Sequence, residues 1–225
     1  MSQPRFDDRR DGGRALAARL RAYAGQPDVR VLALPRGGVP VGYEVARALG
    51  APLDVFLVRK LGAPNYDELA MGALADGGVR VLNSSVISRL GISEEDLERV
   101  TAREATELAR RAQRYRSGRP PTDVRGKAVL LVDDGLATGS TMRAAVAALK
   151  QQGPRRLVVG VPVAAARTCE ELESEVDEVA CATTPEPFYA VGQWYRHFEQ
   201  TDDEEVQALL TLALQEQEVS HGVGQ

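Results

Sequence analysis

The chain has 225 residues, 44% of them hydrophobic, which is enough for a sizeable core in one α/β domain with extensions. Its 28 basic and 32 acidic residues give a net charge of −4, so charge alone attracts neither nucleic acid nor an anionic membrane surface. The first ten residues lack the apolar core of a signal peptide, and the apolar run 157–166 is too short to span a bilayer. We therefore expect a soluble, cytoplasmic protein that binds no nucleic acid and no membrane.

The sequence alternates between apolar, β-branched segments and helical patterns. Strands are predicted at 29–34, 53–58, 128–132 and 156–162, with a weaker fifth at 178–182. Helices are predicted at 12–23, 41–49, 93–115, 141–152 and 166–176; an acidic stretch at 202–205 begins a last helix, and 216–225 is expected to fray. Continuous apolar strands that alternate with helices indicate an α/β fold, a parallel sheet with helices on both faces.

The helical pattern at 93–115 is the clearest, and we expect a helical insertion at 93–116. Ser93 and Asp96 give it a start like a capping box. One narrow stripe is mostly apolar and is expected to be buried, namely Leu97, Val100, Glu104, Leu108, Ala112 and Tyr115. The remaining face is charged and is interpreted as solvated surface, namely Glu94, Glu98, Arg103, Glu107, Arg110, Arg111 and Arg114.

The two cysteines are Cys169 and Cys181, and neither has a metal-site spacing with a histidine. A pair of cysteines in a cytosolic chain is usually reduced. We expect both to be reduced and structural.

The strongest functional signal lies at 129–141, where an apolar strand runs directly into Asp133 and Asp134 and then into a Gly- and Thr-containing loop before a helix. Ligands of open α/β sheets bind there, because loop N–H groups and the positive end of the next helix face the same space. Hydroxyl donors around a glycine suit a phosphate, and two adjacent carboxylates can accept hydrogen bonds from the vicinal diol of a ribose. The expected substrate-binding residues of the loop are Gly135, Ala137, Thr138, Gly139, Ser140 and Thr141.

Other phosphate and nucleophile motifs lack a required residue. A P-loop needs a lysine before its Ser/Thr, and Gly139 is followed directly by Ser140. Neither G-x-G-x-x-G nor G-x-S-x-G occurs. The structural alternative is that the two carboxylates only cap a helix, but capping needs one acid rather than two acids and three hydroxyls.

The segment Val129-Leu-Leu-Val-Asp-Asp-Gly-Leu-Ala-Thr-Gly-Ser-Thr141 resembles the signature of type I phosphoribosyltransferases, an apolar strand followed by Asp-Asp-x-x-x-Thr-Gly-x-Thr. The matching residues are Asp133, Asp134, Thr138, Gly139 and Thr141. The order of elements across about 29–163 is similar to the family core, and the whole pattern is similar to a poorly characterised bacterial group of phosphoribosyltransferase-like proteins. The resemblance implies phosphoribosyl pyrophosphate as donor and a C-terminal hood or tail at about 183–225.

Such a donor requires a cationic region for its pyrophosphate. Arg36, Gly37 and Gly38 follow a predicted strand and look like the family's pyrophosphate loop, in which the glycines are expected to adopt unusual backbone angles; a plain tight turn is the alternative. Arg59 and Lys60 follow the next strand, where the family has a mobile loop that closes over the substrate; an ordinary solvated strand end is the alternative.

The resemblance implies a Mg²⁺-dependent transfer of the 5-phosphoribosyl group to an unidentified, nitrogenous small-molecule acceptor, with release of pyrophosphate. Mg²⁺ would be held mainly through substrate oxygens, with Asp133 or Asp134 as a further ligand through water. The expected catalytic residues are Asp133, Asp134, Arg36, Arg59 and Lys60. Two alternatives stay open, namely a non-catalytic regulatory protein that binds phosphoribosyl pyrophosphate, and an unrelated sugar-phosphate isomerase or kinase.

The acceptor side has the weakest sequence signal. The segment 185–198 contains five aromatic residues, among them the only tryptophan of the chain. Trp194 and Tyr195 are candidates for an acceptor pocket because planar bases stack on aromatic rings; packing of a tail or a homodimer face is the alternative. No residue identifies the acceptor.

Overall fold

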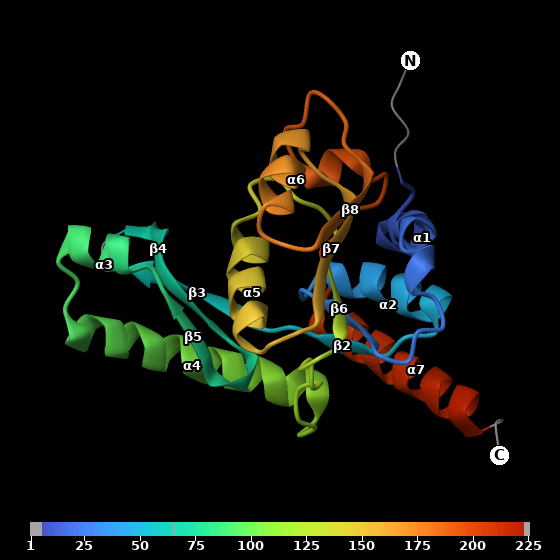
Figure 1. The fold of residues 1–225 in the computed structure, drawn as a ribbon, viewed down its shortest axis with the longest axis horizontal. Helices are drawn as coiled ribbons and strands as arrows, with labels where there is room; N and C mark the ends of the chain where they lie inside the picture. The colour runs from blue at the N-terminus through green and yellow to red at the C-terminus, as the bar shows by residue number, and fades with distance from the viewer. Residues whose placement is uncertain (1–5, 65, 223–225) are drawn as a thin grey trace.

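The computed structural model describes residues 6–64 and 66–222, and it has a five-stranded parallel sheet at its centre (Figure 1). The strand order is β2-β1-β6-β7-β8. The strands are β1 (Val29–Ala33), β2 (Leu53–Val55), β6 (Ala128–Val132), β7 (Arg156–Val163) and β8 (Glu178–Thr183). This architecture confirms the predicted α/β fold with a parallel sheet.

Helices cover both faces of this sheet, and β6 shows why its sequence is apolar throughout. All five residues of β6 are buried. Ala128, Leu130 and Val132 belong to the core that lies under one group of helices, namely α1 (Arg9–Arg19), α2 (Gly38–Leu49) and α7 (Asp203–Gly222). Val129 and Leu131 belong to the opposite core, which α5 (Ser140–Gln151) and α6 (Ala166–Glu173) cover. A strand buried on both faces has no need for polar alternation.

Residues 58–116 form an arm beside the main sheet, seen at the left of Figure 1. It contains an antiparallel sheet of β3 (Val58–Ala63), β4 (Tyr66–Ala75) and β5 (Val79–Leu82), together with α3 (Ser84–Leu90) and α4 (Glu94–Arg116). The arm has its own apolar core, which includes Leu61, Met71, Leu97 and Val100. The predicted stripe of α4 is buried at Leu97, Val100, Glu104 and Tyr115 and partly buried at Leu108 and Ala112. Asp96 N donates to the predicted cap residue Ser93.

Two predictions for this region are wrong. The predicted strand 53–58 is interrupted, because the chain leaves the main sheet after Val55 and β3 starts the second sheet at Val58. The segment after Arg59 and Lys60, expected as a loop, is a strand pair, and its expected mobility stays a prediction. Its β4 contains three alanines and one glycine and has weak strand propensity, but a Cβ on Gly72 would lie only 2.4 Å from the Val81 carbonyl oxygen of β5. Close antiparallel pairing therefore forms these strands.

A buried ion cluster anchors the arm to the main sheet. The Arg116 side chain, only 3% exposed, donates to the carboxylates of Asp54 at 3.0 Å and Asp76 at 2.8 Å. It also donates to the Val55 carbonyl oxygen at 2.5 Å. Because Asp54 and Val55 belong to β2 and Asp76 follows β4, one guanidinium joins α4 to both sheets.

The remaining helices differ from the predictions mainly at their ends. α2 starts at Gly38 rather than at residue 41, and α1 starts at Arg9, where Asp8 caps it by accepting from Asp11 N. The expected fraying from residue 216 is wrong up to Gly222: α7 continues to that residue, and Glu216 accepts from the Tyr43 hydroxyl at 2.9 Å. Residues 223–225 lie outside the described part. None of the described helices combines the length and hydropathy needed to cross a membrane.

The expectation of two reduced cysteines is also wrong, because Cys169 of α6 and Cys181 of β8 form a disulfide. Cys169 lies in the apolar core between α6 and the sheet, and the partly buried Cys181 packs against this core. Their separation of 12 residues in the chain does not predict this disulfide, which forms because α6 packs on β8.

Candidate functional site

The two loops predicted to bind the donor leave neighbouring strands at the same edge of the sheet. β1 and β6 are parallel, and Ala33 pairs with Val132 at their carboxyl ends. Leu34 N then donates to the Val132 carbonyl oxygen at 2.9 Å, so the pairing continues into both loops. Residues 34–38 and 133–139 consequently begin side by side, as sequence reasoning placed them.

Asp134 has hydrogen bonds at its side chain, its backbone N–H and its carbonyl oxygen. Its Oδ2 accepts a hydrogen bond from Arg9 Nε at 2.8 Å, and the two side chains are only 16% and 12% exposed. Its backbone N donates to Asp133 Oδ1 at 2.8 Å, and its carbonyl oxygen accepts from the Tyr195 hydroxyl at 2.5 Å. Sequence reasoning missed Arg9, which lies 125 residues away in the chain and carries no motif.

The two carboxyl groups resist full ionisation in the folded chain. Burial raises the pKa of Asp133 well above its usual range, and the charge of Asp134 raises it further. Burial also raises the pKa of Asp134, while the hydrogen bond from Arg9 opposes the shift. A cation or a pair of hydroxyl donors beside the two groups would lower the cost of their charge, which fits the predicted contact with a ribose diol.

Gly37 and Gly38 are pressed against this acid pair. A Cβ on Gly37 would lie 2.1 Å from Asp134 Oδ2, and a Cβ on Gly38 would lie 2.9 Å from the Val132 carbonyl oxygen and 3.0 Å from Asp133 Cα. The predicted reason for these glycines is wrong, because Gly37 has an ordinary helical φ of −60° and ψ of −29°. Lack of a side chain, rather than unusual backbone angles, lets the two loops meet.

The loop 135–141, called the phosphate loop below after its predicted ligand, has its hydroxyl-bearing residues at the surface. Ala137, Thr138, Ser140 and Thr141 are exposed, and Gly139 precedes α5 with a φ of 69°, where a side chain would be strained. The first N–H groups of a helix have no partner inside the helix, so the start of α5 offers donors to an anion together with these hydroxyls.

α6 and the C-terminal segment contact this loop. Thr168 of α6 donates its hydroxyl to the Ala137 carbonyl oxygen at 2.6 Å. A Cβ on Gly139 would approach Thr168 Cγ2 to 2.9 Å, and one on Gly135 would approach Val191 Cγ1 to 2.5 Å. The loop therefore has fixed neighbours on two sides.

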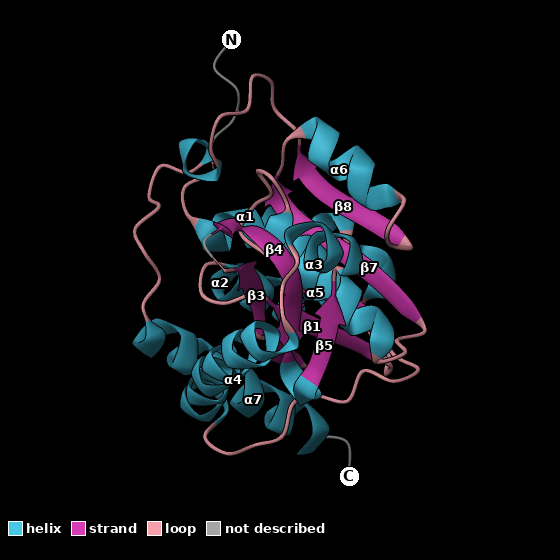
Figure 2. Cartoon of the chain, turned by 90° about the vertical axis from the view of Figure 1, so that its left-hand side faces the viewer, coloured by secondary structure: helices cyan, strands magenta, loops and turns pink. Residues whose placement is uncertain are grey.

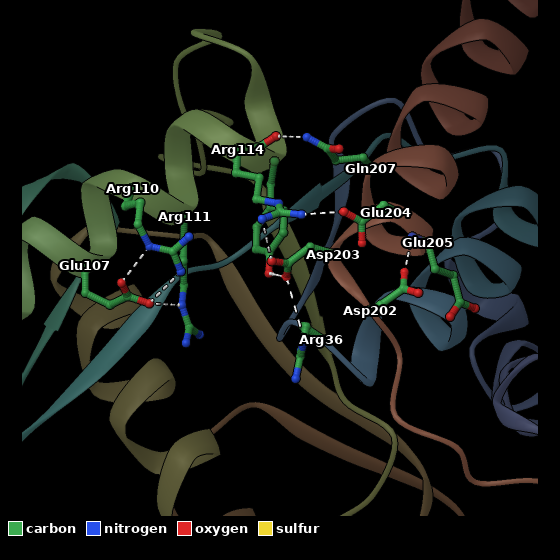
Figure 3. A network of polar contacts seen from close by, with 11 residues as sticks. Arg36, Glu107, Arg110, Arg111, Arg114, Asp202, Asp203, Glu204, Glu205 and Gln207 are labelled. Atoms are coloured by element: carbon green, nitrogen blue, oxygen red, sulfur yellow. Dashed lines mark hydrogen bonds and ion pairs between the residues drawn. The ribbon is translucent and has the colours of Figure 1, made fainter.

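The predicted pyrophosphate residues do not form one open cationic pocket. The Arg36 side chain is 35% exposed and lies 4.0 Å from Asp203 Oδ1 of α7 (Figure 3). Asp203 also accepts from the Tyr115 hydroxyl at 2.5 Å and pairs with Arg114 at 3.2 Å. Arg36 thus borders a network that joins α4 to α7, two helices that lie against each other in Figure 2.

The second cationic pair lies on β3 rather than after a strand of the main sheet. Arg59 contacts Glu104 of α4 at 2.7 Å, and Lys60 is exposed on the same strand. Arg59 and Thr141 nevertheless line a common small cleft of about 30 Å³, which Pro35, the neighbour of Arg36, and Arg111 of α4 also line. The structure thus brings part of the arm to the phosphate loop.

The charged face of α4 was therefore only partly a solvated surface. Arg111 reaches the cleft beside Thr141, and Arg114 binds Asp203 and Glu204 of α7. No pattern within α4 distinguishes these two arginines from Arg103 or Arg110, which have the same residue type on the same face.

The aromatic residues proposed for the acceptor pocket have packing contacts. Tyr195 is only 4% exposed, and its hydroxyl is bound to the Asp134 carbonyl oxygen, so it has no open face for a base. Trp194 stacks beside Phe188 with ring centroids 6.4 Å apart, and its Nε1 is buried without a hydrogen-bond partner among the described residues. Tyr195 therefore holds the C-terminal segment on the acid pair.

The described residues contain no group of three or more His, Cys, Asp or Glu side chains arranged to hold a metal ion. A cation at this edge of the sheet would find two carboxylates, Asp133 and Asp134, and would need further oxygen ligands from a substrate or from water.

Comparison with known proteins agrees with the site. The family model of the phosphoribosyl transferase domain matches residues 7–197. A Mycobacterium tuberculosis protein provisionally named phosphoribosyl transferase is 47% identical over 208 residues, which cover 92% of this chain and 47% of that protein. A Chloroflexus aurantiacus protein named bifunctional protein PyrR is 35% identical over 130 residues, covering 56% of this chain and 65% of that protein.

Among solved structures, the crystal structure of TT1426 from Thermus thermophilus has a TM-score of 0.82 and is 46% identical, covering 92% of this chain and 97% of that one. The chain spans about half the length of the Mycobacterium tuberculosis relative. Since the family model covers most of the sequence and includes both loops of the site, the chain belongs to the phosphoribosyl transferase domain family.

Proposed function

We propose that this chain transfers the 5-phosphoribosyl group of phosphoribosyl pyrophosphate to a nitrogenous small molecule and releases pyrophosphate. One observation carries the proposal: the Asp133–Asp134 pair and the Arg36–Gly37–Gly38 loop meet at the ends of adjacent strands, with Gly37 directly against Asp134. Family membership and the name of the Mycobacterium tuberculosis relative support the same activity.

The parts of the donor have separate binding partners in this proposal. The 5-phosphate lies at the start of α5, where Thr138, Ser140 and Thr141 have exposed hydroxyls. The ribose diol donates to Asp133 and Asp134. The pyrophosphate lies toward Arg36 and the cleft lined by Arg59 and Arg111, whose charges stabilise the leaving oxygens.

The chemistry requires no nucleophile from the protein. The bond between ribose C1 and the pyrophosphate oxygen breaks, and pyrophosphate leaves with the electron pair. A nitrogen lone pair of the acceptor forms the new bond to C1, and the acceptor nitrogen loses a proton to solvent. The buried carboxylates lie close to the ribose, where they stabilise the positive charge that develops on the sugar.

The donor set fits a magnesium ion bound largely through substrate. Two adjacent carboxylates with raised pKa values gain from a nearby cation, and Mg²⁺ prefers oxygen ligands and retains water. When bound, Mg²⁺ would neutralise charge on the pyrophosphate. Asp133 and Asp134 are the residues that would hold it, directly or through water.

A regulatory protein that binds phosphoribosyl pyrophosphate without transfer is the second candidate. It is favoured by the ion pairs on the pyrophosphate side, because Arg59 is already bound to Glu104 and Arg36 lies beside Asp203. A sensor needs only the phosphate and ribose contacts, whereas a transferase needs these cations to turn toward the leaving group.

One experiment separates the two candidates. The protein is incubated with phosphoribosyl pyrophosphate, Mg²⁺ and a pool of nucleobases and small amines, and pyrophosphate and ribosylated products are followed by mass spectrometry. Release of pyrophosphate matched by one phosphoribosylated acceptor supports transfer. Binding measured by calorimetry without release supports the sensor, and absence of binding contradicts both. The Asp133→Asn/Asp134→Asn variant serves as the inactive control.

A further inference from the structure

Arg9 lies outside the loops that define the site, yet it forms an ion pair with one of the two acidic residues of the site. Its Nε lies 2.8 Å from Asp134 Oδ2, and its side chain is only 12% exposed. Arg9 is the first residue of α1, and Asp8 caps that helix by accepting from Asp11 N. A capped helix start thus fixes where this guanidinium emerges.

The same guanidinium also holds the C-terminal segment. Arg9 Nη1 donates to the Glu199 carbonyl oxygen at 2.7 Å, and its Cζ lies 3.8 Å from the centre of the Phe198 ring. Tyr195 reaches the same acidic residue from this segment, through the Asp134 carbonyl oxygen. Asp134 is therefore held at its side chain by α1 and at its backbone by the C-terminal segment.

This arrangement determines which carboxylate oxygen remains for a sugar. Arg9 occupies Asp134 Oδ2, and Gly37 lies against the same oxygen, since a Cβ there would be 2.1 Å away. Oδ1 of Asp134 is the oxygen that neither contact uses. A planar guanidinium with donors in fixed directions can hold the carboxylate, the carbonyl and the ring together, whereas an ammonium group cannot.

We infer that Arg9 is a positioning residue that fixes the Asp134 carboxylate so that Oδ1 faces the ribose hydroxyls of the donor. The inference rests on the proposed function, because it assumes that Asp134 binds the ribose. It adds the N-terminal helix to the donor site and makes the placement of Asp134 depend on residues 198–199 of the C-terminal segment.

The test measures binding rather than turnover. Isothermal titration calorimetry is run with phosphoribosyl pyrophosphate and Mg²⁺, and again with ribose 5-phosphate, which lacks the pyrophosphate. We expect Arg9→Lys and Arg9→Gln to weaken both ligands about tenfold or more, the size expected when a hydrogen bond to a charged group is lost. Arg14→Gln is the control for Arg9→Gln, because it removes one positive charge from the same helix. Arg14 is 53% exposed and pairs with Asp11 and Glu44 rather than with Asp134, so the affinities of Arg14→Gln should equal those of the wild type.

A double-mutant cycle separates positioning from general support of the fold. If Arg9 acts through Asp134, Arg9→Lys has no further effect on affinity in an Asp134→Asn background. The part of its effect on melting temperature that comes from the contacts with Glu199 and Phe198 persists there. Equal weakening in both backgrounds overturns the inference, as does wild-type affinity of Arg9→Lys and Arg9→Gln. If Arg9→Gln fails to fold, Arg9→Lys alone decides the cycle. Wild-type protein that binds neither ligand overturns the proposed function itself, and the inference with it.

Discussion

Replacing Gly37 by alanine tests the close approach of the two loops. The backbone of Gly37 already has helical angles that alanine adopts easily, so the change introduces no backbone strain. The new Cβ would lie 2.1 Å from Asp134 Oδ2 and 2.8 Å from its Cγ. Because non-bonded carbon and oxygen atoms need more than about 3 Å, either the carboxylate or the loop must shift by about 1 Å.

The expected result has two parts. Displacing a catalytic or binding group by about 1 Å can cost about 100-fold, so we expect affinity for phosphoribosyl pyrophosphate, or kcat/KM once an acceptor is known, to fall by about that factor. Overpacking of this kind typically costs about 1–3 kcal/mol, so urea denaturation should show a free energy of unfolding lowered by that amount.

A matched control is available in β7. A Cβ on Gly160 would meet the Leu16 and Leu20 side chains at 3.4 Å, an ordinary van der Waals distance, so Gly160→Ala should leave ligand affinity unchanged. Wild-type affinity and stability of Gly37→Ala would refute the contact between the loops. Loss of stability with unchanged affinity would refute the link between that contact and the ligand.

Three further outcomes are expected. The pKa of Asp133 is raised in the folded chain, so the folded state loses stability relative to the unfolded state as the pH rises through that pKa. Asp133→Asn should therefore raise the free energy of unfolding near pH 8, and the gain should vanish below about pH 4. Urea titrations at both pH values measure this difference. Arg116→Met leaves two buried carboxylates without their cation and should cost about 3–5 kcal/mol. Arg110→Gln, at an arginine 55% exposed, should cost less than about 1 kcal/mol. Equal melting temperatures for the two variants would contradict the anchoring role. Thr168→Val removes the hydroxyl contact to the phosphate loop and should cost about 1 kcal/mol and weaken ribose 5-phosphate binding in calorimetry, and unchanged binding would show that α6 does not hold the loop.

The local parts of the fold and site could be predicted from the sequence because their causes are local. β6 was predicted with its observed ends, because five consecutive apolar residues between polar ones indicate a strand that is buried on both faces. The chemistry of loop 133–141 is contained in consecutive residues. The placement of Arg36, Gly37 and Gly38 beside it followed from the rule that parallel strands end at one edge of a sheet.

Contacts between distant segments could not be predicted, because neither segment contains a motif or pattern that indicates its partner. Arg9 and Asp134 are 125 residues apart, and Arg9 is one of four arginines in α1, with no motif around it. Gly72 lowers the strand propensity of β4, although the lack of a side chain at this position lets β5 lie close to β4. The pairing of Cys169 with Cys181 depends on how α6 lies on β8, which periodicity does not specify.

The most direct test of the central claim is the melting temperature of the protein with millimolar phosphoribosyl pyrophosphate and Mg²⁺. A ligand that binds only the folded chain raises its stability by mass action. We predict a clear rise for the wild type and for Arg14→Gln, and loss of most of it in Asp133→Asn/Asp134→Asn, measured relative to each variant without ligand. No rise in the wild type, or an equal rise in the double variant, would contradict the assignment of the acid pair as the ribose site.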